Sequence, residues 1–266
     1  MSSQPWLRGP PVNDLHRPPV MASSERTTLA LLSRGEIDID QGEPHGRISL
    51  MLVAMLGYSR LVRTLLNKGA NFAIADDDGF SALHLSAQGG HLDAIKLLVK
   101  AGAELDTRAR TQGTTPLHLA ADEGRSEVVT ALIEAGANSN SRALSGMTSL
   151  YVAAQNGHVA AVKVLLRAKA NPLLTCWNPT GFVLLVPLDI VAHDGHSEVV
   201  DELIKEYGIE GCGGATDGVQ ALRGAAQGQH LEIMRMLISA GVVASCRNEG
   251  PRVVREVPAA AAGGEH

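Results

Sequence analysis

The sequence predicts an all-α solenoid, in which similar pairs of short helices stack in one dimension. One leucine recurs about every 33 residues, each segment around it encodes two short helices, and one segment is too small to fold alone. The recurring leucines are spaced by 33, 34, 33, 38 and 34 residues and are Leu50, Leu83, Leu117, Leu150, Leu188 and Leu222. A repeat of this length indicates units that are stable only when stacked on their neighbours.

The clearest unit contains Gly113–Gly124, with the sequence G-T-T-P-L-H-L-A-A-D-E-G. Thr115 can cap a helix N-terminus with its hydroxyl group, and Pro116 suits the first helical position. Gly124 can adopt the left-handed conformation that ends a helix. The apolar side chains of Val128–Ile133 then predict a second short helix, so the unit is a pair of antiparallel helices.

The energy balance of one unit explains why it must stack. About six buried apolar side chains contribute roughly 1.5–3 kcal/mol each. Ordering the backbone of about 33 residues costs roughly 1–2 kcal/mol per residue. This deficit has to be offset by burial against neighbouring units.

Three segments of the chain align without gaps: S-A-L-H-L-S-A-Q-G-G-H (81–91), T-P-L-H-L-A-A-D-E-G-R (115–125) and T-S-L-Y-V-A-A-Q-N-G-H (148–158). With their period, these motifs resemble the ankyrin repeat family, and the resemblance covers roughly Thr27–Val243. It implies an ankyrin-repeat solenoid of stacked helix-turn-helix units, each with a projecting β-hairpin finger. It also implies that the inner helices and the fingers line a concave contact surface.

The resemblance divides the chain into six repeats with additional segments at both ends. Residues 1–22, rich in Pro, Ser and Arg, are expected to be a disordered leader, and residues 244–266 a disordered tail. Residues 23–45 are expected to form an N-terminal half-repeat cap. The six ankyrin-like repeats together cover 46–243 and span about 46–76, 77–110, 111–142, 143–175, 176–212 and 213–243. The sixth is either a weak terminal cap or the start of a frayed end.

Four repeats depart from the family pattern at the residue after the recurring leucine, where the family has histidine. The first repeat has Met51, the fourth Tyr151, the fifth Asp189 and the sixth Arg223. The fifth repeat also has five extra residues, two of which are expected in its finger and the rest near Val183–Leu185.

Charge and composition exclude several partners. The formal net charge is −5 and aromatic residues make up 3%, which disfavours nucleic acid as a partner. The apolar runs are too short to span a membrane, so no membrane partner is expected. Three cysteines, odd in number and far apart, indicate a reducing compartment. The expected location is cytoplasmic, with a nuclear one as the alternative, and the prolines of the leader disfavour an organellar transit peptide.

The ten histidines do not indicate a metal site. No Cys or His pair has the spacing of zinc ligands, and the sequence lacks an EF-hand loop, a phosphate loop and a nucleophile elbow. We therefore expect no catalytic residue, no metal and no cofactor. The resemblance implies instead that six histidines bond to the backbone between repeats: His84, His91, His118, His158, His196 and His230.

The resemblance implies that residues beside the finger glycines and on the exposed part of the first helices face a partner. These candidates are Asp77, Asp78, Phe80, Gln88, Thr111, Gln112, Thr114, Asp122, Glu123, Leu144, Ser145, Met147, Gln155, Asn156 and Trp177. Phe80, Leu144 and Met147 are the most informative, because a large apolar fingertip residue has no role within its own repeat. The alternative is that they pack on adjacent fingers. Trp177, in the enlarged fifth finger, is either a further contact or buried under the insertion.

The sequence thus predicts a non-catalytic protein–protein interaction module, an intracellular scaffold or adaptor that is monomeric and binds a protein partner. The alternative is a substrate-recruiting subunit or a fragment of an enzyme complex, such as a ubiquitin ligase or a kinase, although no such enzyme domain is encoded. The partner's identity does not follow from the fold, because ankyrin frames bind many unrelated targets.

Overall fold

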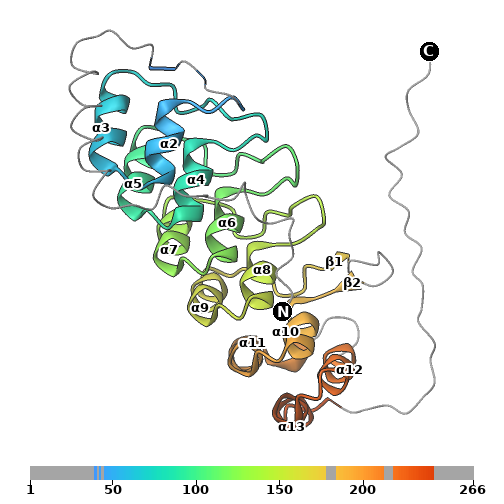
Figure 1. Ribbon diagram of the computed structural model, residues 1–266. Coiled ribbons are helices and arrows are strands. Elements are labelled where there is room, and N and C mark those ends of the chain that lie inside the picture. The colour runs from blue at the N-terminus through green and yellow to red at the C-terminus, as the bar shows by residue number, and fades with distance from the viewer. Residues whose placement is uncertain (1–38, 41, 43–44, 178–183, 213–217, 243–266) are drawn as a thin grey trace, which may run out of the picture.

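The computed structural model describes residues 39–40, 42, 45–177, 184–212 and 218–242 (Figure 1). The segments predicted to be a leader and a tail, and most of the predicted half-repeat cap, lie outside these residues. The described part is a stack of helix pairs, which confirms the predicted solenoid.

The helices form two layers along the stack (Figure 1). The inner layer contains the first helix of each pair: α2 (Ser49–Met55), α4 (Ala82–Gly89), α6 (Pro116–Asp122), α8 (Ser149–Gln155), α10 (Pro187–Asp194) and α12 (Val219–Gln227). The outer layer contains the second helix: α3 (Ser59–Asn67), α5 (Leu92–Lys100), α7 (Ser126–Glu134), α9 (Val159–Arg167), α11 (Ser197–Cys212) and α13 (Leu231–Ser239). Each inner helix packs against the next inner helix, and each outer helix against the next outer one.

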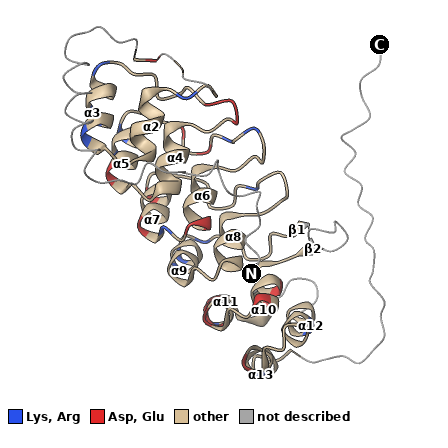
Figure 2. Cartoon of the chain, viewed as in Figure 1, with Lys and Arg blue, Asp and Glu red and all other residues tan. Residues whose placement is uncertain are grey.

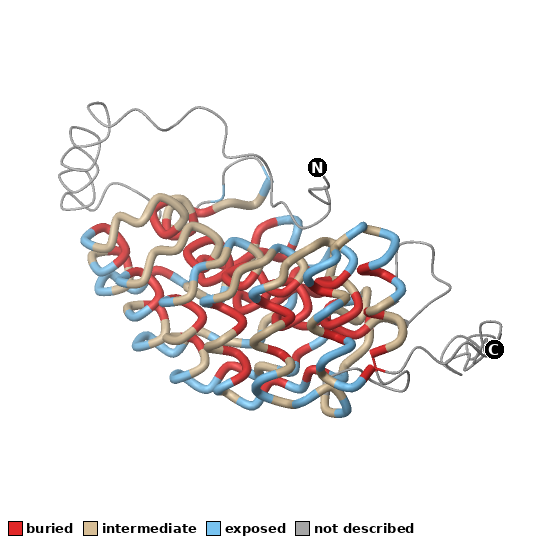
Figure 3. The backbone as a smooth tube through the Cα atoms, turned by 90° about the horizontal axis from the view of Figure 1, so that it is seen from below, coloured by how far each residue is buried: buried red, intermediate tan, exposed pale blue. Residues whose placement is uncertain are grey.

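The core runs through the stack between the two layers (Figure 3). The first five recurring leucines are at most 1% exposed, which places their side chains in one continuous core. The alanine four residues after each of these leucines is also fully buried, and its small side chain lets the neighbouring helix approach closely. The period seen in the sequence is therefore the period of this core.

The ends of α6 form as the sequence predicts. Thr115 is the N-cap residue and Pro116 occupies the first turn. The helix ends at Asp122, and Gly124 has the left-handed φ of 64° that allows the chain to turn into α7. These local signals explain why the helices of this repeat are short.

The loops between helix pairs form fingers that join along the stack. We define the finger row as residues 76–80, 109–114 and 142–147. The Asp77 amide donates to the carbonyl of His45 over 3.1 Å, the Arg110 amide to Asp78 over 2.8 Å, and the Leu144 amide to Gln112 over 2.8 Å. Each fingertip is thereby fixed to the one before it by main-chain groups.

The finger of the fifth repeat contains a short hairpin. Strand β1 (Cys176–Trp177) pairs antiparallel with β2 (Leu184–Leu185), with Cys176 opposite Leu185. Part of the predicted insertion near Val183–Leu185 thus forms the second strand of this hairpin.

Candidate partner-binding surface

The histidine after the recurring leucine links its own helix to the next finger. In α4, the amide of Ser81 donates to Nδ1 of His84 over 3.2 Å, and Nε2 of His84 lies 3.2 Å from the carbonyl oxygen of Thr114. Because Nδ1 accepts, the proton is on Nε2, which donates to that carbonyl. In α6, His118 makes the same pair of bonds, 3.2 Å to the Thr115 amide and 3.1 Å to the Met147 carbonyl.

These two imidazoles are held neutral. Burial lowers the pKa of His84 to about 4 and that of His118 to about 4, because the charged ring would lose its hydration inside the stack. The hydrogen bonds to carbonyls oppose this shift only in part. A neutral ring is also the form that can accept at Nδ1 and donate at Nε2, so burial and hydrogen bonding require the same tautomer.

A second row of histidines joins the repeats on the other side of the inner helices. Nε2 of each ring lies 2.8–3.1 Å from a main-chain carbonyl oxygen of the preceding repeat: His91 at Met55, His158 at Asp122, His196 at Gln155 and His230 at His193. The predicted role of all six repeat histidines is thereby confirmed.

Glycines in the left-handed conformation make room for this second row. At Gly124, with φ of 64°, an added Cβ atom would lie 2.6 Å from Nδ1 of His158. At Gly195, with φ of 87°, it would lie 2.5 Å from the ring of His230. The glycine is needed both for its backbone conformation and for the close approach of the ring.

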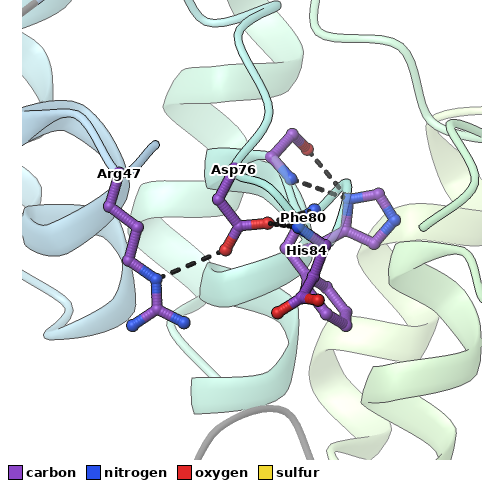
Figure 4. A network of polar contacts seen from close by, with 6 residues as sticks. Arg47, Asp76, Phe80 and His84 are labelled. Carbon is purple, nitrogen blue, oxygen red and sulfur yellow. Dashed lines mark hydrogen bonds and ion pairs between the residues drawn. The ribbon is translucent and has the colours of Figure 1, made fainter. Parts of the chain in front are cut away.

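Phe80 does not face outward as the sequence suggested. Oδ1 of the buried Asp76 accepts from the amides of Phe80 (2.8 Å) and Asp78 (3.1 Å), while Oδ2 pairs with Arg47 Nε at 3.3 Å (Figure 4). This turn directs the Phe80 ring inward, where it is 6% exposed and meets the His84 ring edge-on at 5.7 Å. The prediction that Phe80 is an exposed fingertip anchor is wrong, because the turn buries it.

Two other apolar or small finger residues are less accessible than expected. Thr114 is only 1% exposed, so its predicted outward position is also wrong: its carbonyl faces His84 inside the stack. Met147 is half-buried, and its carbonyl accepts from His118. Trp177 lies in β1, and its side chain falls outside the described residues.

Leu144 is the exposed apolar residue of the finger row. Its side chain is 72% exposed, although it lies beside Gly113, where a Cβ atom would come within 3.0 Å of it. Its neighbour Ser145 is half-buried, whereas Asp77, Asp78 and Thr111 are exposed on the preceding fingertips and Gln112 is half-buried. The structure therefore presents most of the predicted finger residues along one edge of the molecule.

The charges of the finger row change sign along the stack (Figure 2). The finger before α4 carries the exposed carboxylates of Asp77 and Asp78. The finger before α6 carries the exposed Arg110, with the exposed Arg108 just before it, and the finger before α8 carries the exposed Arg142. Arg108 donates to the Arg142 carbonyl over 2.6 Å, and Arg142 to that of Thr175 over 2.6 Å, so two of these arginines also join neighbouring fingers.

The remaining candidates lie at the C-terminal ends of the inner helices. Asn156, exposed after α8, donates from Nδ2 to the Asp122 carboxylate over 2.7 Å and to its carbonyl over 3.2 Å. Glu123 is exposed, and Gln88 and Gln155 are half-buried. These side chains form a polar area that extends from repeat to repeat.

A buried polar cluster between the fourth and fifth repeats was not predicted. Tyr151, Cys176 and Asp189 are 3%, 1% and 6% exposed and lie close together. Burial, the nearby Cys176 thiol and a hydrogen bond to it raise the pKa of the Tyr151 phenol, and burial raises that of the Cys176 thiol. The signal available in the sequence was that Tyr151 and Asp189 both replace the motif histidine.

Asp189 makes only one of the two kinds of hydrogen bond that the motif histidine makes. Its Oδ2 accepts from the Val186 amide over 3.0 Å, as Nδ1 of His84 accepts from Ser81. Its Oδ1 is buried and has no hydrogen-bond partner among the residues that the structure describes. Burial raises the pKa of Asp189 to about 7, and the bond from Val186 opposes this shift.

Within the described residues, no three His, Cys, Asp or Glu side chains are grouped so that they could hold a metal ion. None of the helices in that part of the chain is both long and apolar enough to cross a bilayer.

The chain is similar to repeat regions of several larger proteins. It is 33% identical over 161 residues to the E3 ubiquitin-protein ligase XBAT32 of Arabidopsis thaliana, covering 60% of this chain and 29% of that protein. It is 38% identical over 81 residues to the palmitoyltransferase AKR1 of Saccharomyces cerevisiae, covering 30% of this chain and 11% of that protein. With the human Notch-regulated ankyrin repeat-containing protein it shares 32% identity over 74 residues, 28% of this chain and 65% of that protein. The chain thus spans less than two thirds of each of these relatives.

A family model described as ankyrin repeats (3 copies) matches residues 20–109 and 105–176, more than half of the chain. The matched residues contain the first four helix pairs and the bonds of His84, His91, His118 and His158. The chain belongs to the ankyrin repeat family.

Proposed function

We propose that this chain is a non-catalytic protein-binding module that holds one protein partner against its finger row and the adjoining ends of its inner helices. The observation that carries the proposal is Leu144, whose side chain is 72% exposed on a finger that is itself fixed by main-chain bonds. An exposed apolar side chain in a fixed position is suited to anchor a partner, because little ordering entropy is spent on binding.

The proposed contact area also includes the other accessible candidates on the fingers and at the ends of the inner helices. It comprises the exposed or half-buried Asp77, Asp78, Gln88, Thr111, Gln112, Asp122, Glu123, Ser145, Met147, Gln155 and Asn156. Phe80 and Thr114 are excluded because they are buried. The change from carboxylates to arginines along the fingers favours a partner segment with the opposite order of charges.

The decisive experiment compares two substitutions that change the charge equally. Leu144→Asp places a carboxylate on the finger row. Ala160→Asp places one on α9, at the exposed position where α5, α7 and α11 already have Asp93, Glu127 and Glu198. Both variants should keep the thermal midpoint of the wild type, because both side chains are exposed.

Proteins captured from a native lysate by the three forms are identified by mass spectrometry, and each is then titrated calorimetrically as a purified protein. We expect a partner that binds the wild type and the Ala160→Asp variant but not the Leu144→Asp variant. A partner that binds all three forms equally would contradict the assignment of this surface.

A second candidate function is the recruiting arm of an enzyme complex. The similarity to an E3 ubiquitin-protein ligase over 60% of this chain favours it. In that case the chain would bring a substrate to a ligase or kinase core without itself carrying catalytic residues. Co-purification with such a core would support this function, and stoichiometric binding of one non-enzymatic protein would support the first.

A further inference from the structure

Three arginines lie at the two fingers that are joined through the Leu144 amide (Figure 2). Arg108 and Arg142 occupy equivalent positions, each directly before the buried alanine of its finger, and Arg110 lies at the tip of the finger before α6. All three side chains are exposed. The equivalent residue of the second repeat is Ala75, so the arginines begin with the third repeat. We define the arginine edge as Arg108, Arg110 and Arg142.

Contacts with neighbouring fingers fix the positions of these side chains. Nη1 of Arg108 donates to the carbonyl of Arg142 over 2.6 Å, and Nη2 of Arg142 donates to that of Thr175 over 2.6 Å. The stem of Arg110 lies against Gly79, where an added Cβ atom would come within 2.8 Å of its Cγ atom. A guanidinium group has five N–H donors, so each of the three keeps donors for a further acceptor. Because the groups are already ordered, little rotamer entropy is lost when a partner binds them.

The charge of the arginine edge is not balanced within the described part of the chain. There, none of its guanidinium groups forms an ion pair, whereas Arg47 of the first repeat pairs with Asp76 at 3.3 Å. Asp106, two residues before Arg108, accepts instead from the Asn138 amide over 3.1 Å. The formal net charge of the whole chain is −5, but exposed charges are screened beyond about 8 Å at physiological salt. The local sign, which is positive, therefore decides what binds here.

Carboxylates on both sides limit where an acidic partner can lie. Asp122 and Glu123 are at the other end of α6, about 10 Å from its first residue at 1.5 Å per residue. Asp77 and Asp78 are exposed on the preceding finger. An acidic segment that crossed the helix ends or the second-repeat finger would meet like charges, so it fits along the fingers before α6 and α8.

We propose that the arginine edge and Leu144 bind an extended acidic segment of a protein partner. Carboxylates of the segment accept from the free guanidinium donors, and one large apolar side chain packs against Leu144. The inference rests on the proposed function, because it names the chemistry of the partner for the same surface.

The spacing of the fingers sets the spacing of the acidic residues. Neighbouring helices pack about 8–10 Å apart, and an extended chain advances about 3.3 Å per residue. Acidic residues about three positions apart therefore reach the arginines of consecutive fingers. The exposed Leu144 favours a peptide over a nucleic acid, because a phosphate backbone has no apolar group to place against it.

The test selects ligands for the full wild-type chain from a phage-displayed library of random linear peptides. The most enriched peptide is then synthesised and titrated calorimetrically. We expect enrichment of Asp and Glu around one large apolar residue, and weaker binding of the synthetic peptide at high salt.

Two substitutions with the same change of charge make the test specific. Arg110→Glu alters a side chain that makes no hydrogen bond or ion pair within the described residues, and it should weaken peptide binding by about tenfold, because repulsion replaces attraction. Arg63→Glu is the control on α3, at an exposed position where α11 has Asp201, and it should bind the peptide as the wild type does. Both variants should keep the thermal midpoint of the wild type.

Four results would overturn the proposal: no enrichment of any peptide, enriched peptides without acidic residues, equal peptide affinities of Arg110→Glu and Arg63→Glu, or displacement of the peptide by a more tightly bound thymidine oligonucleotide. The last would assign the edge to a nucleic acid. Each of these results contradicts the chemistry of the segment alone. The binding surface itself is rejected separately, if a partner captured from the lysate binds the wild type, Ala160→Asp and Leu144→Asp equally.

Discussion

In the second and third repeats, one imidazole ring accepts a hydrogen bond from the amide before its own helix and donates another to a carbonyl of the next finger. In the fifth repeat, a carboxyl group makes only the first of these two bonds. His84 and His118 form hydrogen bonds with both ring nitrogens, whereas Oδ1 of Asp189 is buried and has no hydrogen-bond partner within the described part of the chain. The helix forms in either case, because the bond before the helix is kept. What differs is how firmly one repeat is attached to the next and how that attachment responds to pH.

The largest expected effect is that the two regions respond to pH in opposite directions. The pKa of Asp189 is raised from 3.8 to about 7, so its contribution to stability is present below about pH 4 and is lost as the pH rises through 7. The pKa values of His84 and His118 are lowered from 6.5 to about 4, so their contribution is present above pH 6.5 and is lost as the pH falls through 4.

Asp189→Asn should therefore remove the fall in stability between pH 4 and 8 and leave the rise due to the histidines. The two curves of unfolding free energy against pH should separate by at most about 4 kcal/mol, because the pKa of Asp189 is raised by roughly three units and each unit corresponds to about 1.36 kcal/mol. Urea unfolding at several pH values measures it, with the exposed Asp78→Asn as control. Parallel curves for the wild type and Asp189→Asn would show that Asp189 does not couple folding to protons.

The next effect is the loss of a bridging ring. His118→Ala leaves the Thr115 amide and the Met147 carbonyl without their partner inside the stack, so stability at pH 7 should fall by about 2–4 kcal/mol. Asp189→Ala removes one bond but also an unpaired buried oxygen, so its cost should be smaller than that of His118→Ala. Denaturant unfolding of both variants at pH 7 measures the difference, and equal costs would mean that the bond to the next finger contributes nothing.

For the second row of histidines, we expect the third and the fifth repeats to respond alike to substitution. Gly124→Ala and Gly195→Ala each place a methyl group against a histidine ring, so both should cost about 2 kcal/mol or more. Gly69→Ala, with a φ of 87° and open space around it, isolates the cost of the backbone conformation, about 1 kcal/mol. Thermal unfolding of the three variants compares them; a Gly195→Ala cost equal to that of Gly69→Ala would indicate a looser fifth repeat.

The smallest effect concerns the polar link between inner helices. Asn156→Ala removes the two bonds to Asp122, but the residue is exposed and water can replace its amide. A loss of about 0.5–1 kcal/mol is expected in urea unfolding. In the fifth repeat the corresponding Asp194 pairs instead with His193 in its own helix, so Asp194→Ala should leave the stacking unaffected. A larger loss for Asp194→Ala would show that this link is not specific to the regular repeats.

The sequence was sufficient for the stack because its signals are local and repeated. Leu117 and its counterparts, the cap at Thr115 and the glycine at Gly124 each act within a few residues, and the structure confirms them. The bonds of the repeat histidines could be expected because the regular motif positions carry the resemblance to the ankyrin repeat family, which implies these bonds. Regularity was therefore the source of the correct predictions.

The errors and omissions arose where the direction or the pairing of a side chain depends on its neighbours in space. Phe80 follows a finger glycine and is expected outside, but the Asp76 carboxylate accepts from the loop amides and the ring turns inward. Cys176 lies 26 residues after Leu150, as Ala143 lies 26 residues after Leu117, so its position in the repeat is regular. Its interaction with Tyr151 was missed because both side chains differ from those at the same positions of the preceding repeat.

The way the fingers are joined has a consequence for how such a surface can change. The bonds between fingertips run from amide to carbonyl, and every residue except proline supplies both groups. Substituting an exposed fingertip residue such as Leu144 or Thr111 therefore leaves the scaffold intact, and the proposed contact surface can be changed one side chain at a time. Natural variation and protein engineering can both exploit this separation between the main-chain bonds that shape the finger row and the side chains that it exposes.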